Sequence, residues 1–190
     1  FVSPGNDGIR KEFECLKLDS FEEIALFVEK NDIAYVFVGN EQPLSEGICD
    51  FLENRNIKVI GPSQKAARIE SSKVFSKDLM RKYNIPTAKY EVFEDCEVCC
   101  RYLEGSQFPI VLKADGLAAG KGVVIAQSLN EAQNAVNQLM KDKKFGEAGN
   151  KIVVEGFLTG EEASVFAFSD GKTFVSTIFV FIFSRYVWGY

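Results

Sequence analysis

The chain has 190 residues, of which 46% are hydrophobic, and a net charge of −5 with acidic and basic residues interspersed. This charge pattern argues against a nucleic-acid partner, and the complete lack of histidine excludes Ser-His-Asp triads and His-ligated metals. Five cysteines, an odd number, indicate no disulfide framework and are typical of a protein of the reducing cytoplasm.

The first 70 residues predict alternating helices and strands. Ser20-Phe-Glu-Glu23 has the capping-box pattern of a helix start, and a second amphipathic helix is expected between Leu44 and Leu52. The continuous apolar run at residues 34–38 predicts a buried parallel strand, and residues 58–60 predict another short strand. This alternation predicts an α/β fold whose parallel sheet carries helices on its faces.

Ligands of such sheets bind at the carboxyl ends of the strands. The loops that leave the two strands, residues 39–43 and 61–63, are therefore candidate ligand sites. A polar helical stretch follows at residues 63–84, and we expect a domain boundary near residue 70. Residues 71–190 then predict a second, α+β domain, because short strands alternate with helices from Thr87 onward.

The cluster Cys96-Glu-Val-Cys99-Cys100 contains a C-x-x-C spacing, which is found in redox and zinc sites. Together with Leu103, however, these cysteines follow the i, i+3, i+4, i+7 spacing of a buried helix face. The sequence has no second cysteine pair and no histidine to complete a zinc site. We therefore predict buried thiols on a helix.

The most informative stretch is Val111-Leu-Lys-Ala-Asp-Gly-Leu-Ala-Ala-Gly-Lys-Gly-Val-Val124, an apolar strand that enters a glycine-rich loop. Its glycines let backbone N–H groups approach an anion, and Lys113 and Lys121 supply charges suited to phosphate oxygens. The β-branched residues after the loop predict strand–loop–strand, which fits neither a Walker loop nor a dinucleotide fingerprint. We predict a flap over the phosphates of ATP. The alternative is an ordinary glycine-rich hairpin with two solvated lysines.

A series of short motifs occurs in the order found in one enzyme family. They are Pro-Gly-Asn (4–6), Val-Gly-x-Glu-x-Pro-Leu (38–44), Gly-Pro-Ser (61–63), Glu-Ser-Ser-Lys (70–73), Ile-Pro-Thr-Ala (85–88), Lys-Ala-Asp-Gly-Leu-Ala-Ala-Gly-Lys-Gly-Val (113–123), Phe-Gly-Glu-Ala-Gly (145–149) and Gly-Glu-Glu-Ala-Ser (160–164). From residue 1 to about residue 172, the chain resembles the phosphoribosylamine–glycine ligases (glycinamide ribonucleotide synthetases), which are ATP-grasp enzymes of purine biosynthesis. The resemblance implies an incomplete pre-ATP-grasp domain and a partial ATP-grasp domain, from a monofunctional enzyme or a trifunctional one.

This resemblance also implies a reaction. ATP phosphorylates the carboxylate of glycine, and the amine of 5-phosphoribosylamine then attacks the acyl phosphate to give glycinamide ribonucleotide, ADP and phosphate. Mg²⁺ or Mn²⁺ is the implied metal. Phosphoryl transfer of this kind depends on positioning and charge neutralisation, so no side chain is assigned as a catalytic nucleophile or base.

The resemblance implies that one group of residues contacts the phosphates of ATP. Lys113 would contact the α- and β-phosphates, and Lys73 would approach the phosphates. Gly120, Lys121 and Gly122 would belong to the loop that closes over them. For Lys73, a simple solvated charge is the alternative.

A second group would recognise the rest of the ligands. Glu155 would accept a hydrogen bond from the exocyclic amine of adenine, and Leu158 would lie in the same hinge. Glu162 would accept hydrogen bonds from the ribose hydroxyls, or would be a solvated charge. Glu41 and Ser63 are weaker candidates, for the phosphoribosylamine side.

The chain also departs from the family pattern. A first strand with a glycine-rich turn should precede Phe1, and the resemblance ends before an aromatic-rich tail at residues 173–190. We expect the family's metal ligands to be absent from this chain, and the tail to form a final strand too short to cross a membrane. The expected protein is thus a ligase represented by a fragment. The alternatives are a catalytically silent nucleotide-binding remnant and an ATP-grasp ligase for another acid and amine.

Overall fold

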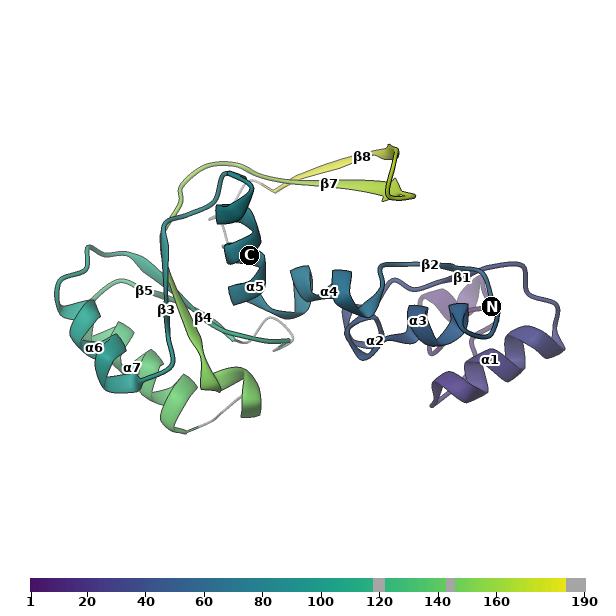
Figure 1. Ribbon diagram of the computed structural model, residues 1–190, viewed down its shortest axis with the longest axis horizontal. Coiled ribbons are helices and arrows are strands. Elements are labelled where there is room, and N and C mark those ends of the chain that lie inside the picture. The colour runs from purple at the N-terminus through teal and green to yellow at the C-terminus, as the bar shows by residue number, and fades with distance from the viewer. Residues whose placement is uncertain (118–121, 143–145, 184–190) are drawn as a thin grey trace. The chain divides into compact units, whose positions relative to one another are not determined.

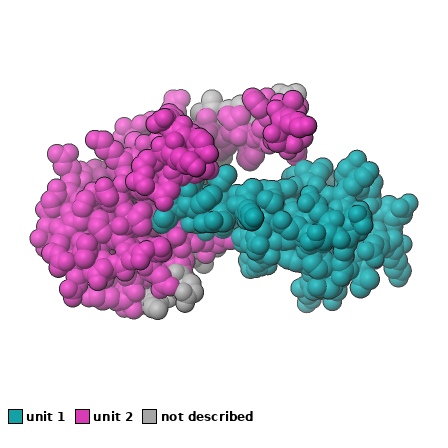
Figure 2. Space-filling model, in the orientation of Figure 1, with its two compact units in different colours: residues 1–76 teal, residues 77–190 magenta. Residues whose placement is uncertain are grey.

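The computed structural model describes residues 1–117, 122–142 and 146–183 (Figure 1). The chain forms two compact units, residues 1–76 and residues 77–190 (Figure 2). Each unit has its own hydrophobic core. The boundary between the units falls within helix α5 (Lys73–Lys82).

The first unit is built on a two-stranded parallel sheet. Its elements are η1 (Ile9–Lys11), α1 (Phe21–Lys30), β1 (Val36–Phe37), α2 (Glu41–Glu46), α3 (Ile48–Glu53), β2 (Val59–Ile60) and α4 (Gln64–Ser71). Strands β1 and β2 pair in parallel, with Val36 opposite Val59, so the predicted parallel sheet is confirmed. The core of this unit consists of Ala25, Val28, Ile48, Cys49, Leu52 and Ile57.

Two stretches predicted as single helices are each divided in two. Within residues 44–52, Gly47 adopts a φ of +92°, a left-handed conformation that side chains with a Cβ rarely take, so α2 ends there and α3 begins. Within residues 63–84, Ser72 is extended, and its Oγ accepts a hydrogen bond from the N–H of Phe75. A serine in this role starts a new helix, which is α5.

The strand prediction at residues 34–38 is right in type but wrong in length and burial. Strand β1 contains two residues, and the Phe37 side chain is 63% exposed. Val36 packs against the core of this unit, whereas Phe37 and Ile60 are exposed. Alternate residues of a strand point to opposite faces, so the apolar run does not have both faces buried as a central parallel strand would.

Both predicted capping boxes are confirmed. Ser20 Oγ accepts a hydrogen bond from the N–H of Glu23 at 3.1 Å, and Ser128 Oγ accepts one from the N–H of Glu131 at 3.4 Å. Each glutamate in turn accepts a hydrogen bond from the backbone N–H of the residue before the capping serine. These contacts satisfy amide groups that lack a partner within the helix.

The second unit contains a four-stranded antiparallel sheet in the order β3-β6-β4-β5. Its elements after α5 are β3 (Tyr90–Phe93), α6 (Cys96–Glu104), β4 (Ile110–Ala114), β5 (Val123–Ala126), α7 (Leu129–Val136), η2 (Asn137–Lys141), η3 (Gly146–Asn150), β6 (Ile152–Gly156), β7 (Glu162–Ser169) and β8 (Phe174–Phe183). The antiparallel pair β4–β5 flanks the glycine-rich loop, so the predicted strand–loop–strand arrangement is confirmed.

Side-chain alternation divides this sheet into two faces. One face packs against α6 and α7, which lie together on one side of the strands (Figure 1). Its residues on the two central strands are Ile110, Leu112, Ala114, Ile152 and Val154. The intervening residues point the other way, so Lys113 and Glu155 belong to the face opposite these helices.

The end of the described chain is a separate two-stranded sheet. Strands β7 and β8 pair antiparallel, with Glu162 opposite Phe183 in the backbone register. The strand predicted in the tail is therefore present as β8. Phe166, Phe168 and Phe174 have exposed side chains on this hairpin. Throughout the described ranges, every helix is too short or too polar to cross a membrane.

The cysteine-bearing helix face is buried as predicted. Cys99 and Leu103 are 0% exposed, and Cys96 and Cys100 pack partly buried against the same core. All five cysteines of the chain are free thiols. The three cysteines of α6, Cys96, Cys99 and Cys100, serve as small apolar side chains.

We predict that Cys99 resists alkylation by iodoacetamide at pH 8 in the folded chain. Burial raises the pKa of its thiol to about 12. At pH 8 a pKa of that size leaves a thiolate fraction of roughly 10⁻⁴, and only the thiolate reacts. The half-buried Cys15 serves as an internal comparison and should label faster. Equal labelling of both thiols in peptide mass spectrometry would contradict the buried position of Cys99.

Candidate functional site

A carboxylate between two ammonium groups lies on the sheet face opposite α6 and α7. Glu155 Oε1 is 3.0 Å from Lys113 Nζ, and Glu155 Oε2 is 2.8 Å from Lys77 Nζ. The exposed fraction is 4% for Lys77, 0% for Lys113 and 3% for Glu155. Charged side chains are almost never buried to this extent unless they are paired. We call these three residues the buried triad.

Strand register brings two members of the buried triad together. Strands β4 and β6 are antiparallel neighbours, and Val111 lies opposite Glu155. Lys113 is two residues further along β4, so it lies on the same face as Glu155 and diagonal to it. A long side chain spans such a diagonal. Lys77 comes from α5, outside the sheet.

Lys77 is held by the segment that leads into β3. Its Nζ donates a hydrogen bond to Thr87 Oγ1 at 2.6 Å and lies 5.9 Å from the centroid of the Tyr90 ring. Tyr90 is paired with Glu155 across β3 and β6, and its hydroxyl donates to Asp78 Oδ1. Burial, and then the hydrogen bond to Asp78, raise the pKa of Tyr90 above its ordinary value, so this residue stays a neutral donor.

The glycine-rich loop is closed at its base. The backbone N–H of Ala114 donates to the carbonyl of Gly122 at 2.8 Å, directly after the paired part of β4. Gly116 has a φ of +144°, and a Cβ added there would lie 2.8 Å from the Cβ of Ala148. This position therefore requires glycine for conformation and for space.

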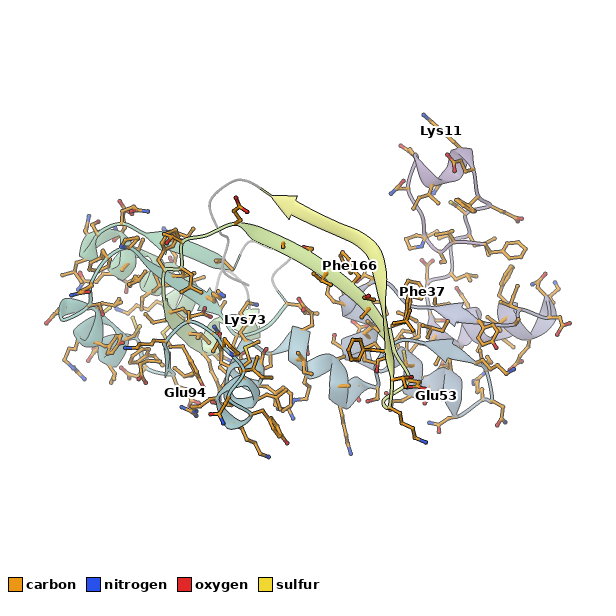
Figure 3. The ribbon with its side chains drawn as sticks, turned by 90° about the horizontal axis from the view of Figure 1, so that it is seen from above. Lys11, Phe37, Glu53, Lys73, Glu94 and Phe166 are labelled. Carbon is orange, nitrogen blue, oxygen red and sulfur yellow. The ribbon has the colours of Figure 1, made fainter. Side chains whose placement is uncertain are left out.

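Of the residues predicted to contact phosphates, Lys113 is in the buried triad and Gly122 is buried at the loop base. Gly120 and Lys121 lie outside the described residues. Lys73 begins α5 and is half-buried (Figure 3). Its proposed contact with nucleotide stays a prediction.

The residues predicted to bind adenine and ribose are distributed along the chain after β5. Glu155 has an ammonium group beside each carboxylate oxygen, so its side chain already has strong partners. Leu158 follows β6 and is 55% exposed, and Glu162 begins β7. Their roles toward a nucleotide stay predictions.

Sequence reasoning missed Lys77. The sequence pattern predicts a polar helix over this stretch, with Phe75, Leu79 and Tyr83 on its apolar face. Nothing in that pattern separates Lys77 from the exposed Lys82 on the same helix. The burial of Lys77 arises from contacts with Thr87 and Glu155, which are distant in the sequence.

The first unit has a hollow at the carboxyl ends of β1 and β2, where ligand sites were expected. It has a volume of about 170 Å³ and is lined by Gly39, Glu41, Leu44, Pro62, Ala67 and Glu70. Glu41 thus faces a hollow, whereas the Oγ of Ser63 accepts a hydrogen bond from the N–H of Ala66 and caps α4. The two predicted residues differ in surroundings although both follow a strand end.

Among the described residues, no group of three or more cysteine, aspartate or glutamate side chains is arranged to hold a metal ion. The carboxylate of Glu155 is neutralised by two lysines. Magnesium requires oxygen ligands in near-octahedral geometry, which this arrangement does not offer.

The fold and the site define an ATP-grasp domain, since residues 71–187 match the family model described as phosphoribosylglycinamide synthetase, ATP-grasp (A) domain. Residues 1–70 match the model for the N domain of the same synthetase. The chain therefore belongs to the phosphoribosylglycinamide synthetase family.

Individual relatives agree with this assignment. The phosphoribosylamine–glycine ligase of Neisseria meningitidis serogroup B is 45% identical over 174 residues, which is 90% of this chain and 41% of the relative. A bifunctional purine biosynthetic protein of Pichia angusta is 44% identical over 92% of the chain and 23% of its own length. The crystal structure of the Thermotoga maritima ligase matches with a TM-score of 0.70 and 31% identity, over 91% of this chain and 41% of that one. The chain thus spans well under half the length of these relatives.

We predict that Glu155→Gln destabilises the folded chain by about 3–5 kcal/mol, because removing one partner of a buried ion pair leaves uncompensated charge. Urea unfolding followed by circular dichroism measures the change. The control is Glu94→Gln. Glu94 is labelled in Figure 3, and it forms an exposed ion pair with Lys151. That variant should change the free energy of unfolding by less than about 1 kcal/mol. Equal effects of the two substitutions would contradict the importance of burial.

We also expect Gly116→Ala to destabilise the chain by about 1–3 kcal/mol, because the added Cβ meets Ala148 and the backbone conformation is unfavourable for alanine. Gly105→Ala is the matched control. Gly105 has a φ of −98°, and the nearest atom to an added Cβ is 3.9 Å away. The same unfolding measurement compares the two variants. A Gly116→Ala variant as stable as Gly105→Ala would show that the loop base tolerates a side chain.

Proposed function

We propose that the protein to which this chain belongs ligates glycine to 5-phosphoribosylamine, with conversion of ATP to ADP and phosphate. Family membership supports the reaction, and one structural observation carries the assignment of the nucleotide site. Lys113 lies on β4, the strand that leads into the glycine-rich loop, and its ammonium is held by Glu155 of the neighbouring strand β6. The proposal places the nucleotide on residues 71–190 and the phosphoribosylamine side on residues 1–70.

The reaction has two steps. An oxygen of the glycine carboxylate attacks the γ-phosphorus of ATP, and the bond to the β-phosphate oxygen breaks, which releases ADP. The amine nitrogen of 5-phosphoribosylamine then attacks the acyl carbon and loses a proton, while the bond to phosphate breaks. The product is glycinamide ribonucleotide.

In this scheme the chain binds and orients the polyphosphate. Lys113 would neutralise phosphate oxygens as their charge is redistributed, and the backbone N–H groups of the glycine-rich loop would add hydrogen bonds. Glu155 would keep Lys113 in one orientation. The family also uses a divalent cation, whose ligands we do not assign to this chain.

The hollow of the first unit supports the phosphoribosylamine side of the proposal. Glu41, which follows β1, and Glu70, on α4, are both among the residues that line it. Carboxylate oxygens accept hydrogen bonds from amines and sugar hydroxyls, and 5-phosphoribosylamine carries both. A cytoplasmic location is part of the proposal and is supported by the five free thiols.

We predict that Lys113→Met weakens ATP binding by about tenfold or more, since a hydrogen bond to a charged group is worth roughly 1.5–3 kcal/mol. AMP binding should fall by a smaller factor, because AMP offers Lys113 only the α-phosphate. Isothermal titration calorimetry with both nucleotides measures the difference. The control is Lys141→Met, since Lys141 is exposed and lies in η2, which packs with the helices.

Turnover is tested separately, by incubating the chain with ATP, glycine and 5-phosphoribosylamine and measuring ADP release. Release that depends on both co-substrates supports the ligase reaction for this chain. ATP binding without turnover would favour the alternative of a catalytically silent nucleotide-binding chain. Equal affinity for ATP and AMP would contradict the proposed phosphate contacts.

A further inference from the structure

We propose that Lys77 is a positioning residue for nucleotide binding, which acts through Glu155 to hold the ammonium of Lys113 in place for the polyphosphate. This inference rests on the proposed function. It concerns a residue on α5 that is separated from Lys113 and Glu155 along the chain and meets them on the sheet face opposite α6 and α7.

The carboxylate of Glu155 is shared between two lysines. Lys77 pairs with Oε2 of Glu155, and Lys113 pairs with Oε1. The terminal torsion of a glutamate side chain is broad, so a carboxylate with one partner can turn about its bond to the chain. Lys77 restrains that rotation. The oxygen that faces Lys113 therefore keeps one position.

Lys77 is itself fixed by its contacts. Two of its three N–H donors have partners, Glu155 Oε2 at 2.8 Å and Thr87 Oγ1 at 2.6 Å. The Tyr90 ring lies beside the same ammonium. With these contacts and 4% exposure, Lys77 is a rigid anchor for the carboxylate.

The order that Lys77 imposes on Lys113 affects the affinity for a phosphate. A flexible lysine loses rotamer freedom when it binds a phosphate, and that loss weakens binding. Lys113 is already ordered in the buried triad, so less freedom is lost on binding. Removing Lys77 should return part of that freedom to Lys113 without removing any group that contacts the nucleotide.

The test compares Lys77→Met with the unsubstituted full chain by isothermal titration calorimetry with ATP and with AMP. We expect ATP affinity to fall about two- to tenfold, the factor that corresponds to losing the pre-ordering of one side chain, while AMP affinity falls by a smaller factor. Lys77→Arg should restore part of the loss. Lys82→Met, an exposed lysine on the same helix, is the matched control and should leave both affinities unchanged.

A double-substitution cycle tests whether Lys77 acts through Glu155. If it does, adding Lys77→Met to Glu155→Gln causes no further loss of ATP affinity. Additive losses would overturn the proposal, and so would an equal loss of AMP affinity.

A nucleotide-free measurement separates this inference from the proposed function. Trace acetylation with acetic anhydride, read by peptide mass spectrometry, should modify Lys113 severalfold faster in Lys77→Met than in the unsubstituted chain. Cys99 should stay unreactive toward iodoacetamide, which shows that the core is intact. If the unsubstituted chain does not prefer ATP to AMP, the proposed function fails, and with it the nucleotide role of Lys77. The acetylation rate still reports whether Lys77 orders Lys113.

Thr87→Val provides a second variant in case Lys77→Met exposes Cys99. Thr87 is exposed, and this substitution removes the hydroxyl that accepts a hydrogen bond from Lys77. The three charges of the buried triad stay in place. ATP affinity and Lys113 acetylation should change in the same directions as for Lys77→Met, by a smaller factor. Unchanged values for both would overturn the proposal.

Discussion

The second unit depends on one electrostatic constraint, which is that a charge removed from water must have a partner. Glu155 is buried between Lys77 and Lys113, and these three side chains come from β6, α5 and β4. An unpaired charge in this place would be strongly destabilising. The constraint therefore holds a helix against the face of a sheet, and it keeps a lysine ordered on the strand that enters the glycine-rich loop.

The two faces of the four-stranded sheet carry different kinds of side chain. One face forms a hydrophobic core with α6 and α7, to which Leu112, Val154 and Cys99 contribute. The other carries the buried triad. Because successive residues of a strand point to opposite faces, a single strand such as β4 supplies both the core and the charged group. The stability of the helix-packed face thus supports a precise position for Lys113, one residue away from Leu112.

Local sequence patterns predicted much of this architecture. The capping boxes at Ser20 and Ser128, the buried face of α6 and the strand–loop–strand unit depend on contacts within a few residues, and such contacts leave a clear periodicity. The single helices expected at residues 44–52 and 63–84 were wrong because Gly47 and Ser72 interrupt the backbone while the apolar spacing continues. The apolar periodicity shows which face of a helix a residue lies on, but it does not show whether the helix is continuous.

The sequence by itself indicated the family and the strand–loop–strand unit, and it singled out Lys113 and Glu155 as candidate site residues, because ordered motifs and strand alternation are local properties of the chain. Only the tertiary structure decided that these two residues form an ion pair and that Lys77 completes it. Lys77 and Lys82 are both lysines of one polar helix, and their local patterns do not tell them apart. What distinguishes Lys77 is burial against Thr87 and Glu155, and long-range packing of this kind has no periodic signature in the sequence.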